Sequence, residues 1–409
     1  MERFEITRLG HRGDGIAQDA EGQTVFVPRT LPGEVVEGQR KGDTVPEPRI
    51  VTPSADRVSP PCRHAKSCGG CQLQHVSETF AARWKESVIR NALAAHGVEA
   101  DIRPMLTSPP RSRRRATFSA RRTKKGALAG FHALRSDVVI AVPDCTLVTP
   151  RLAAALPMVE ALAVLGASRK GELSVQVTDS LSGLDVGVTG GKTPDVTLRQ
   201  ALSDIGRAFD LARIAWDDEV LTRRPPIQRF GSVDVVPPPG TFLQATQAGE
   251  TALRAAVLDI LAGSTCVADL FAGCGTFALP LAGKRPVHAV EANRAMLAAL
   301  DHGWRQGTGL RKVTTEARDL FRNPLLPDEL ARFDGIALDP PRAGAEAQIT
   351  QIIGARVPCV AYVSCNPVTF AKDAARMIAA GYEIGAVQGI DQFRWSTHVE
   401  LVAGFTLKG

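Results

Sequence analysis

A cysteine and three carboxylates stand at the ends of apolar runs in the second half of the chain. Cys365 follows CVAYVS, Asp339 follows GIAL, Glu291 ends HAVE and Asp319 follows VTTEAR. Because the carboxyl ends of successive parallel strands open on one crevice, we expect these side chains to share a ligand site. A thiolate there can act as a covalent nucleophile, and a carboxylate can accept a proton. The alternative is that Cys365 is a buried structural thiol, since cysteine often behaves as a small hydrophobic residue.

The segment 267–280, VADLFAGCGTFALP, predicts an apolar strand, a tight glycine turn and a helix. Gly273 and Gly275 let the backbone turn sharply and approach a ligand closely. Glu291 follows about twenty residues later, where a carboxylate binds the ribose hydroxyls of a nucleoside; the alternative is a surface carboxylate at a strand end. The turn alone leaves the cofactor open, because Ala278 also satisfies the fingerprint of a nicotinamide-binding domain.

Four phrases around these residues carry a family resemblance. They are GTFLQ ending in Gln244, Asp339-Pro-Pro-Arg342, SCNP around Cys365, and HVE ending in Glu400. Together with the D-x-F-x-G-x-G turn, they resemble the RNA uridine C5-methyltransferases, specifically the branch that carries a TRAM domain and an iron–sulfur cluster. The resemblance covers nearly the whole chain, and it implies a class I methyltransferase domain that uses S-adenosylmethionine.

The resemblance also implies the chemistry. Carbon 5 of uracil is a poor nucleophile toward a sulfonium methyl, and addition of a thiolate to carbon 6 makes carbon 5 enolate-like. Cys365 is the implied nucleophile and Glu400 the implied base that removes the carbon 5 proton. His398 is the rival base, and period-2 geometry predicts that it shares a strand face with Glu400, where one could orient the other. The implied contacts to S-adenosylmethionine are Gln244, Phe271, Gly273, Gly275, Thr276 (where the family has Asn), Glu291, Asp319 and Asp339.

A second group of cysteines lies near the front of the chain. Cys62-x5-Cys68-Gly-Gly-Cys71 places three thiols in one loop, and Cys145 is the next cysteine along the chain. In a reducing cytosol this clustering indicates metal binding or catalysis rather than disulfides. Four thiolates suit either zinc or an iron–sulfur cluster, and the spacing does not choose between them. The family resemblance implies a [4Fe–4S] cluster, which we expect to staple the middle domain and to shape the RNA contact.

Other features of the first half point to nucleic acid. Glycine-containing turns between short period-2 runs predict a small β-barrel over residues 1–55. Its GDGIA and LPGEVV phrases resemble the TRAM domain, an OB-like RNA-binding barrel. The net charge is +6, and residues 103–125 contain nine Lys or Arg and no Asp or Glu. Such a run predicts a surface that contacts phosphates, or alternatively a solvated basic strand.

The remaining pattern divides the chain in two. Residues 56–236 predict an α+β middle domain with the metal cluster, whose helix 77–97 we expect to pack on the methyltransferase domain. Residues 237–409 alternate strands and helices, which predicts a doubly wound parallel α/β sheet. We find no secretory signal and no apolar stretch long enough to cross a bilayer. We therefore expect a cytoplasmic monomer whose partner is RNA, with no DNA and no membrane.

Two classes of function fit these features. The first is an enzyme that forms 5-methyluridine in structured RNA after flipping the base out of its stack. Among RNAs, 23S ribosomal RNA is favoured over transfer RNA, because the transfer-RNA branch typically lacks the TRAM and cluster modules. The second is a non-catalytic RNA-binding or ribosome-assembly factor on a methyltransferase fold. That class predicts an eroded pocket, whereas Gln244, Glu291, Asp339, Cys365 and Glu400 are all present.

Overall fold

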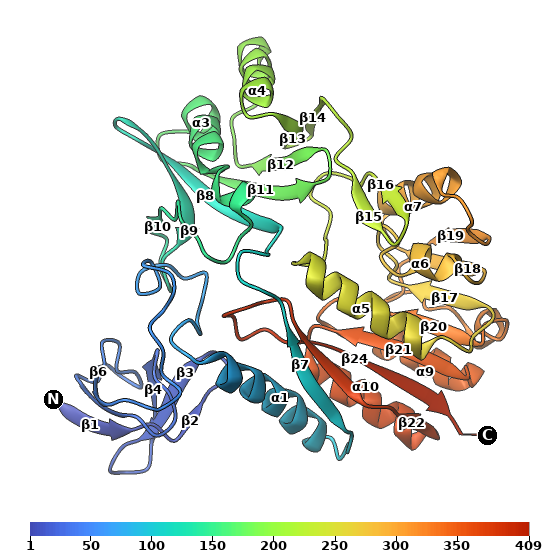
Figure 1. Ribbon diagram of the computed structural model, residues 1–409, viewed down its shortest axis with the longest axis horizontal. Coiled ribbons are helices and arrows are strands. Elements are labelled where there is room, and N and C mark those ends of the chain that lie inside the picture. The colour runs from blue at the N-terminus through green and yellow to red at the C-terminus, as the bar shows by residue number, and fades with distance from the viewer. Residues whose placement is uncertain (409) are drawn as a thin grey trace.

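The computed structural model describes residues 1–408 and arranges them as three bodies (Figure 1). The first is built from two small three-stranded antiparallel sheets, ordered β1-β5-β6 and β2-β3-β4, around a core of valines and Phe4. Alternating burial along these short strands explains the period-2 pattern of the sequence. The strands are β1 (Glu2–Glu5), β2 (Arg8–Leu9), β3 (Asp14–Gln18), β4 (Thr24–Pro28), β5 (Val35–Gly38) and β6 (Arg49–Thr52).

The second body is a seven-stranded sheet ordered β10-β9-β8-β11-β12-β13-β14, covered by helices. Neighbouring strands are antiparallel except β12 and β13, which the crossover helix α4 joins in parallel. Its elements are β8 (Arg115–Thr123), β9 (Gly126–His132), β10 (Val139–Ile140), α2 (Pro150–Ala153), α3 (Leu156–Gly166), β11 (Glu172–Ser180), β12 (Gly183–Thr189), α4 (Val196–Ala208), β13 (Leu211–Trp216) and β14 (Glu219–Thr222).

The third body contains a nine-stranded sheet with the order β19-β18-β17-β20-β21-β24-β23-β7, and β22 pairs with β24. The strands from β19 to β21 are parallel, as predicted, but β24 runs antiparallel to β21, so the sheet is mixed. The order reverses between β17 and β20, and ligands of such sheets bind at that point. The strands are β7 (Ile102–Thr107), β17 (Val267–Leu270), β18 (Val287–Glu291), β19 (Val313–Ala317), β20 (Gly335–Leu338), β21 (Cys359–Ser364), β22 (Tyr382–Ile384), β23 (Val387–Asp391) and β24 (Glu400–Leu407).

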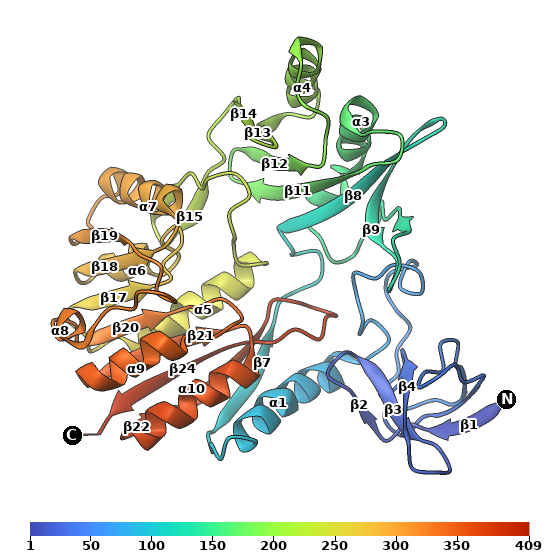
Figure 2. The same ribbon diagram turned by 180° about the vertical axis from the view of Figure 1, so that it is seen from behind.

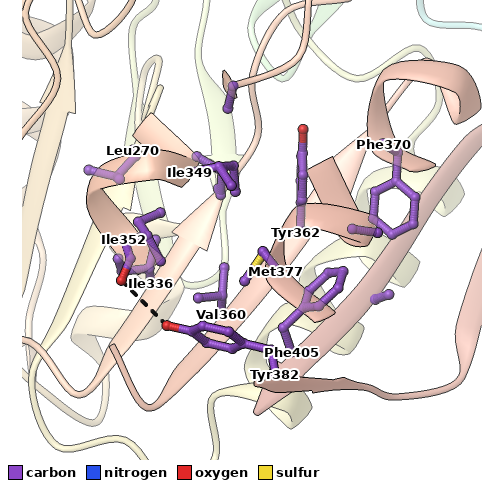
Figure 3. Close-up of a cluster of buried hydrophobic side chains, with 14 of the residues drawn as sticks. Leu270, Ile336, Ile349, Ile352, Val360, Tyr362, Phe370, Met377, Tyr382 and Phe405 are labelled. Atoms are coloured by element: carbon purple, nitrogen blue, oxygen red, sulfur yellow. Dashed lines mark hydrogen bonds between the residues drawn. The ribbon is translucent and has the colours of Figure 1, made fainter. Parts of the chain in front are cut away.

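Helices cover both faces of this sheet (Figures 1 and 2). Helices α5, α6 and α7 pack their apolar residues on one face, and α1, α8, α9 and α10 pack on the other. Figure 3 shows the core on the face covered by α1, α8, α9 and α10, where Tyr362, Phe370 and Phe405 pack between the sheet and α10. The helices are α1 (Glu78–Ala94), α5 (Gln247–Ile260), α6 (Ala278–Ala282), α7 (Arg294–Gln306), α8 (Pro327–Leu330), α9 (Glu346–Ala355) and α10 (Pro367–Ala379).

The division of the chain between the second and third bodies differs from the predicted boundaries of 56–236 and 237–409. Helix α1, capped by the Ser77 hydroxyl, buries Ile89 and Leu93 in the core of the third body, and β7 pairs with β23. The hairpin of β15 (Gln228–Phe230) and β16 (Val233–Val235) packs on α7 as well. The packing of α1 on the third body agrees with the expectation for helix 77–97, whereas the placement of β7 and of the β15–β16 hairpin there was not predicted.

The helices of residues 1–408 include none with the length and apolar character needed to span a bilayer.

Candidate active site

The predicted nucleophile and base lie side by side at one edge of the mixed sheet. Cys365 directly follows β21, and Glu400 is the first residue of β24. Because these strands are antiparallel with Ser364 opposite Leu401, the start of β24 lies beside the residue that follows β21. Asp339 follows β20, the neighbour of β21 on its other side. The thiol and two carboxylates therefore meet above adjacent strands, at the edge where ligands bind.

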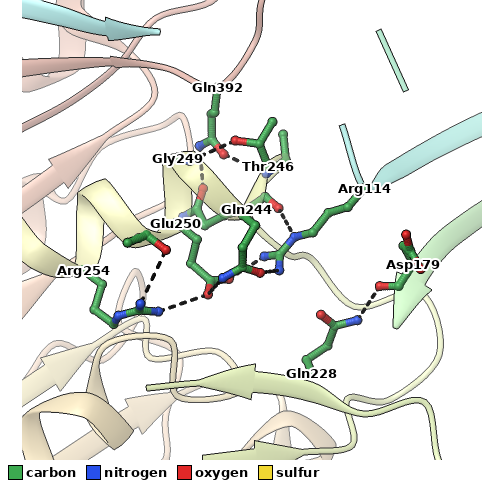
Figure 4. Close-up of polar contacts among 12 residues, drawn as sticks. Arg114, Asp179, Gln228, Gln244, Thr246, Gly249, Glu250, Arg254 and Gln392 are labelled. Carbon is green, nitrogen blue, oxygen red and sulfur yellow. Dashed lines mark hydrogen bonds and ion pairs between the residues drawn. The ribbon is translucent and has the colours of Figure 1, made fainter. Parts of the chain in front are cut away.

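Two glutamines connect these carboxylates. The Gln392 Nε2 group donates to Glu400 Oε2 at 2.9 Å and to Gln244 Oε1 at 2.5 Å. Gln244 Nε2 in turn donates to Asp339 Oδ2 at 3.4 Å. Figure 4 shows Gln244 and Gln392 next to the buried pair of Arg114 with Glu250, and Arg114 Nε donates to the Gln244 carbonyl at 3.1 Å. The predicted residue Gln244 is thus part of a hydrogen-bonded chain that reaches the predicted base.

Burial sets the protonation of this site. Burial raises the pKa of Glu400 to about 7, although the hydrogen bond from Gln392 lowers it. The pKa of Asp339 lies well above its ordinary value because of burial and the charges of Glu400 and Asp269. Burial and the charges of Glu400 and Asp339 raise the pKa of Cys365 to about 11, against a smaller lowering by Arg342. A carboxyl with a pKa near neutrality is suited to general acid–base catalysis.

The glycine turn between β17 and α6 forms a cradle beside this edge. Phe271 and Gly275 have positive φ angles of 63° and 94°, and a Cβ on Gly275 would approach Leu300 and Leu279 to about 3 Å. The Glu291 carboxylate lies against the turn, where Oε2 accepts from the Gly273 N–H at 3.1 Å. This is the arrangement that presents backbone N–H groups and a carboxylate to a nucleoside ligand.

The other residues predicted to contact the cofactor border the same turn. Thr276 is half-buried within it, and Asp319 is exposed beyond the end of β19, where its Oδ1 accepts from the Phe321 N–H at 3.0 Å. The rings of Phe271 and Phe321 lie 5.3 Å apart, which brings the end of β19 to the turn. The residues available to hold a cofactor therefore come from the ends of four neighbouring strands.

His398 does not share the setting of Glu400. It lies in the loop before β24, is exposed, and stacks its ring edge-on against Phe393 at 5.7 Å. Among the described residues, its side chain makes no hydrogen bond to Glu400. The predicted common strand face is therefore wrong, because β24 begins only at Glu400 and the period-2 geometry does not extend back to His398.

The four front cysteines line one cavity of about 290 Å³, together with His64, Arg113 and apolar side chains. All four are free thiols. Burial raises the pKa of Cys71 to about 12 and raises those of Cys68 and Cys145, and the thiols raise one another further. Within residues 1–408, no three His, Cys, Asp or Glu side chains converge closely enough to bind a single metal ion. The structure thus brings the predicted ligands to one cavity without gathering them at one point.

Comparison with known proteins identifies the family. A family model described as tRNA (Uracil-5-)-methyltransferase matches residues 309–408, and the TRAM domain model matches residues 3–37. An uncharacterized RNA methyltransferase of Mesorhizobium japonicum is 45% identical over 402 residues, covering 98% of this chain and 97% of that protein. The 23S rRNA (uracil(1939)-C(5))-methyltransferase RlmD of Halomonas elongata is 34% identical over 432 residues, covering 97% of this chain and 87% of that protein. The chain belongs to the RNA (uracil-C5)-methyltransferases.

The fold agrees with this membership. The tRNA (uracil-54, C5)-methyltransferase of Pyrococcus abyssi, solved with S-adenosyl-L-homocysteine, superimposes with a TM-score of 0.77 over 99% of both chains at 21% identity. The predicted family, the TRAM domain and the C-terminal methyltransferase fold are therefore confirmed. The protein is an S-adenosylmethionine-dependent RNA uracil-C5 methyltransferase.

The basic run 103–125 of this methyltransferase is only partly a surface. Arg114 is buried in its pair with Glu250, and the half-buried Arg115 lies over the Phe242 ring at 5.0 Å. Arg121 is exposed but pairs with Glu172 at 2.6 Å. The remaining exposed cations of the run are Arg103, Arg111, Arg122, Lys124 and Lys125.

Two groups at the methyltransferase site were missed by reasoning from the sequence. Gln392 contacts both Gln244 and Glu400 but stands in a phrase, DQF, that no spacing rule marks. Lys85 of α1 forms a fully buried ion pair with Asp391, the residue before Gln392, at 2.6 Å. A lysine in an amphipathic helix is expected on the solvent-facing side, so the sequence offers no signal that Lys85 is buried.

Proposed function

We propose that this methyltransferase methylates carbon 5 of a uridine in 23S ribosomal RNA through a covalent bond between Cys365 Sγ and carbon 6 of the base. The observation that carries the proposal is the meeting of one thiol with the buried carboxylate of Glu400 and the half-buried carboxylate of Asp339 beside the glycine turn. The ribosomal target is supported by the relative named for 23S rRNA and by the four-cysteine cavity. Transfer RNA is the alternative target, favoured by the name of the matching family model.

The chain's own residues account for each step on the base. Cys365 first loses its proton to solvent, and the thiolate adds to carbon 6 while the ring electrons move onto carbon 5 and its neighbouring carbonyl. S-adenosylmethionine supplies the methyl group, which carbon 5 takes. Glu400 then accepts the carbon 5 proton, the double bond between carbons 5 and 6 re-forms, and Sγ leaves as thiolate. Asp339, at the end of the neighbouring strand β20, can hydrogen-bond the base within the same crevice.

The residues present fit S-adenosylmethionine. We propose that the backbone of the turn from Phe271 to Thr276 contacts the polar groups of S-adenosylmethionine. Glu291 accepts hydrogen bonds from its ribose hydroxyls. A Cβ at Gly275 would crowd the apolar side chains beneath the turn, so the close backbone approach needs glycine there. Asp319, at the end of the next strand, is placed for the far side of the nucleoside.

We further propose a [4Fe–4S] cluster bound by Cys62, Cys68, Cys71 and Cys145. Four free thiols around one cavity suit a cuboidal cluster, in which each thiolate binds a different iron and none needs to reach a common point. Bound there, it would tie the loop 62–71 to the segment after β10. Chemical analysis should find iron and acid-labile sulfide in a brown protein, and C68S should lose both together with the visible absorbance. Stoichiometric zinc in a colourless protein would overturn this assignment.

The RNA path is proposed to cross a second cavity of about 790 Å³ between the barrel and the cysteine loop. Arg12, Arg29 and Lys66 line it and make no ion pair within residues 1–408, so they are available to phosphates. Replacing Arg12 and Lys66 by alanine should weaken RNA binding for all sequences and reduce the slope of log affinity against log salt by about 2. An unchanged slope in a filter-binding titration would place the RNA elsewhere.

Mass mapping of RNA decides the function. Ribosomal and transfer RNA are isolated from a deletion strain that carries either the wild-type gene or C365A. We expect one 5-methyluridine of 23S RNA to be present with the wild-type gene and absent with C365A. A methyl group lost only from transfer RNA would contradict the ribosomal target, and no lost methyl group would favour the non-catalytic class. Because ribosomal RNA is the proposed substrate, we also propose that the enzyme acts in the cytoplasm. We propose separately that it acts as a monomer.

A further inference from the structure

Gln392 occupies a buried position between the predicted base and the loop that carries Gln244. It follows β23 directly, and its side chain is 1% exposed. A buried amide must satisfy one acceptor and two N–H groups, and leaving them unpaired costs free energy. Its side-chain hydrogen bonds join Glu400, Gln244 and the backbone of Ala245, which follows Gln244.

One contact fixes which way the amide points. Gln392 Oε1 accepts a hydrogen bond from the Ala245 backbone N–H at 2.7 Å. Since a backbone N–H can only donate, the oxygen must face Ala245, and the amide cannot be flipped without losing this bond. The Nε2 group therefore faces the crevice, where it reaches Glu400 Oε2 at 2.9 Å and Gln244 Oε1 at 2.5 Å.

The orientation of Gln392 passes on to both of its partners. Gln244 has its oxygen toward Gln392, so its own Nε2 is turned toward Asp339 and the crevice. Glu400 has its Oε2 engaged, which leaves Oε1 as the oxygen that can take a proton. Gln392 provides the sole side-chain hydrogen bond to Glu400 in the part of the chain that the structure describes.

The other groups that face Glu400 cannot replace this donor. Asp339 and the Cys365 thiol approach it from the ends of β20 and β21, and both interact with it through unfavourable charge. Asp391, on β23, instead pairs with Lys85. Burial disfavours the carboxylate form of Glu400, and the Gln392 N–H is the group that favours it.

We propose that Gln392 is a positioning residue for the proton-removal step: its amide holds Glu400 as a carboxylate with Oε1 aimed at carbon 5. The proposal rests on the proposed role of Glu400 as base. In that step the carbon 5 proton passes to Oε1, the electrons of the C–H bond form the double bond to carbon 6, and the C–S bond breaks to release the Cys365 thiolate.

The test separates methyl transfer from product release. Single-turnover reactions use 23S RNA from a deletion strain and S-adenosylmethionine labelled in its methyl group, with Q392L compared to wild type. We expect label to enter RNA within about threefold of the wild-type rate, while release of free methylated RNA slows by about tenfold or more, because a general base typically contributes at least this much. The labelled RNA should meanwhile persist as an adduct with the protein that resists denaturation.

Two further readouts distinguish positioning from general damage. The acid limb of the pH–rate profile should move up by about one unit in Q392L, because a hydrogen bond to a charged group is lost. RNA labelled with deuterium at carbon 5 should show an isotope effect on release only in the variant. Q388L is the matched control, because Gln388 lies on β23, four residues before Gln392, and donates to the Pro104 carbonyl at 2.8 Å, away from the crevice. Equal losses of transfer and release, or an unmoved acid limb, would overturn the proposal.

The same assay distinguishes a failure of this inference from a failure of the proposed function on which it rests. E400Q should trap the labelled adduct, and C365A should form none. If E400Q releases product at the wild-type rate, Glu400 is not the base; if C365A still methylates the RNA, the proposed covalent mechanism itself fails. If E400Q traps the adduct but Q392L releases product like wild type, only the role of Gln392 is wrong.

Discussion

The buried pair of Lys85 and Asp391 should be a main support of the loop that precedes Glu400, the proposed base. Their charged atoms lie 2.6 Å apart and both side chains are buried, so their attraction is worth about 6 kcal/mol at an effective dielectric constant of 20. Burial nevertheless lowers the pKa of Lys85, with Asp391 opposing, so most of this attraction offsets desolvation. K85M removes the attraction and leaves a buried carboxylate behind. We expect it to cost about 3–5 kcal/mol.

Hydrogen exchange and urea unfolding measure this cost. In K85M the amides of residues 392–400 should open from about a hundredfold to about four-thousandfold more often, since each 1.4 kcal/mol is a factor of ten. The double variant K85M/D391N removes the stranded charge and keeps an acceptor for the Phe393 N–H, so it should recover a large part of the loss. A loss below about 1 kcal/mol in K85M, or a double variant less stable than K85M, would refute the reasoning.

Three further outcomes follow from the site. The rate of Cys365 alkylation by iodoacetamide should rise with pH toward a midpoint near its pKa of about 11, and E400Q should lower that midpoint because it removes a negative charge; a midpoint near 8 would contradict the burial argument. Burial raises the pKa of Asp269 to about 8. The protonated carboxyl therefore contributes stability at acid pH, and this contribution is lost as the pH rises to 8. D269N should gain stability over wild type between about pH 5 and 9, as measured by urea unfolding. H398A should keep single-turnover methylation within about threefold, whereas E400Q should lose about a hundredfold in product release, and the reverse ranking would make His398 the base.

Residues at strand ends were predictable because their placement follows from chain direction alone. Cys365, Asp339 and Glu291 each follow an apolar run, and a parallel sheet brings such ends to one edge whatever the details of packing. Glu400 was harder, since it begins its strand rather than ending one. Its position depends on β24 running antiparallel to β21, which the sequence pattern does not show and only the family resemblance supplied.

The partners of these residues could not be predicted, because they lie far away in the chain. Gln392 and Gln244 are separated by 148 positions, and Arg114 and Glu250 by 136. Charge runs mislead for the same reason. Arg114 stands in the basic run 103–125, most of whose cations are exposed, yet the fold turns it inward toward a carboxylate that no local rule connects to it. Local patterns show which face of an element is apolar, but they do not show which distant residue a charged side chain will meet.

The loop between β23 and β24 is where the bodies of the molecule meet. Helix α1 holds the start of this loop through the pair of Lys85 with Asp391. The segment directly after the cysteine loop holds its middle, because the backbone N–H groups of Gln72 and Leu73 both donate to the Trp395 carbonyl at 2.8 and 2.9 Å. Trp395 itself has a φ of 60°, a left-handed conformation that its surroundings must maintain. Glu400 follows five residues later. Order in the loop 62–71, which the proposed cluster would enforce, is thereby linked to the position of Glu400, the proposed base, through backbone hydrogen bonds. The four cysteines can thus serve methylation by holding this geometry, a contribution that requires no transfer of electrons.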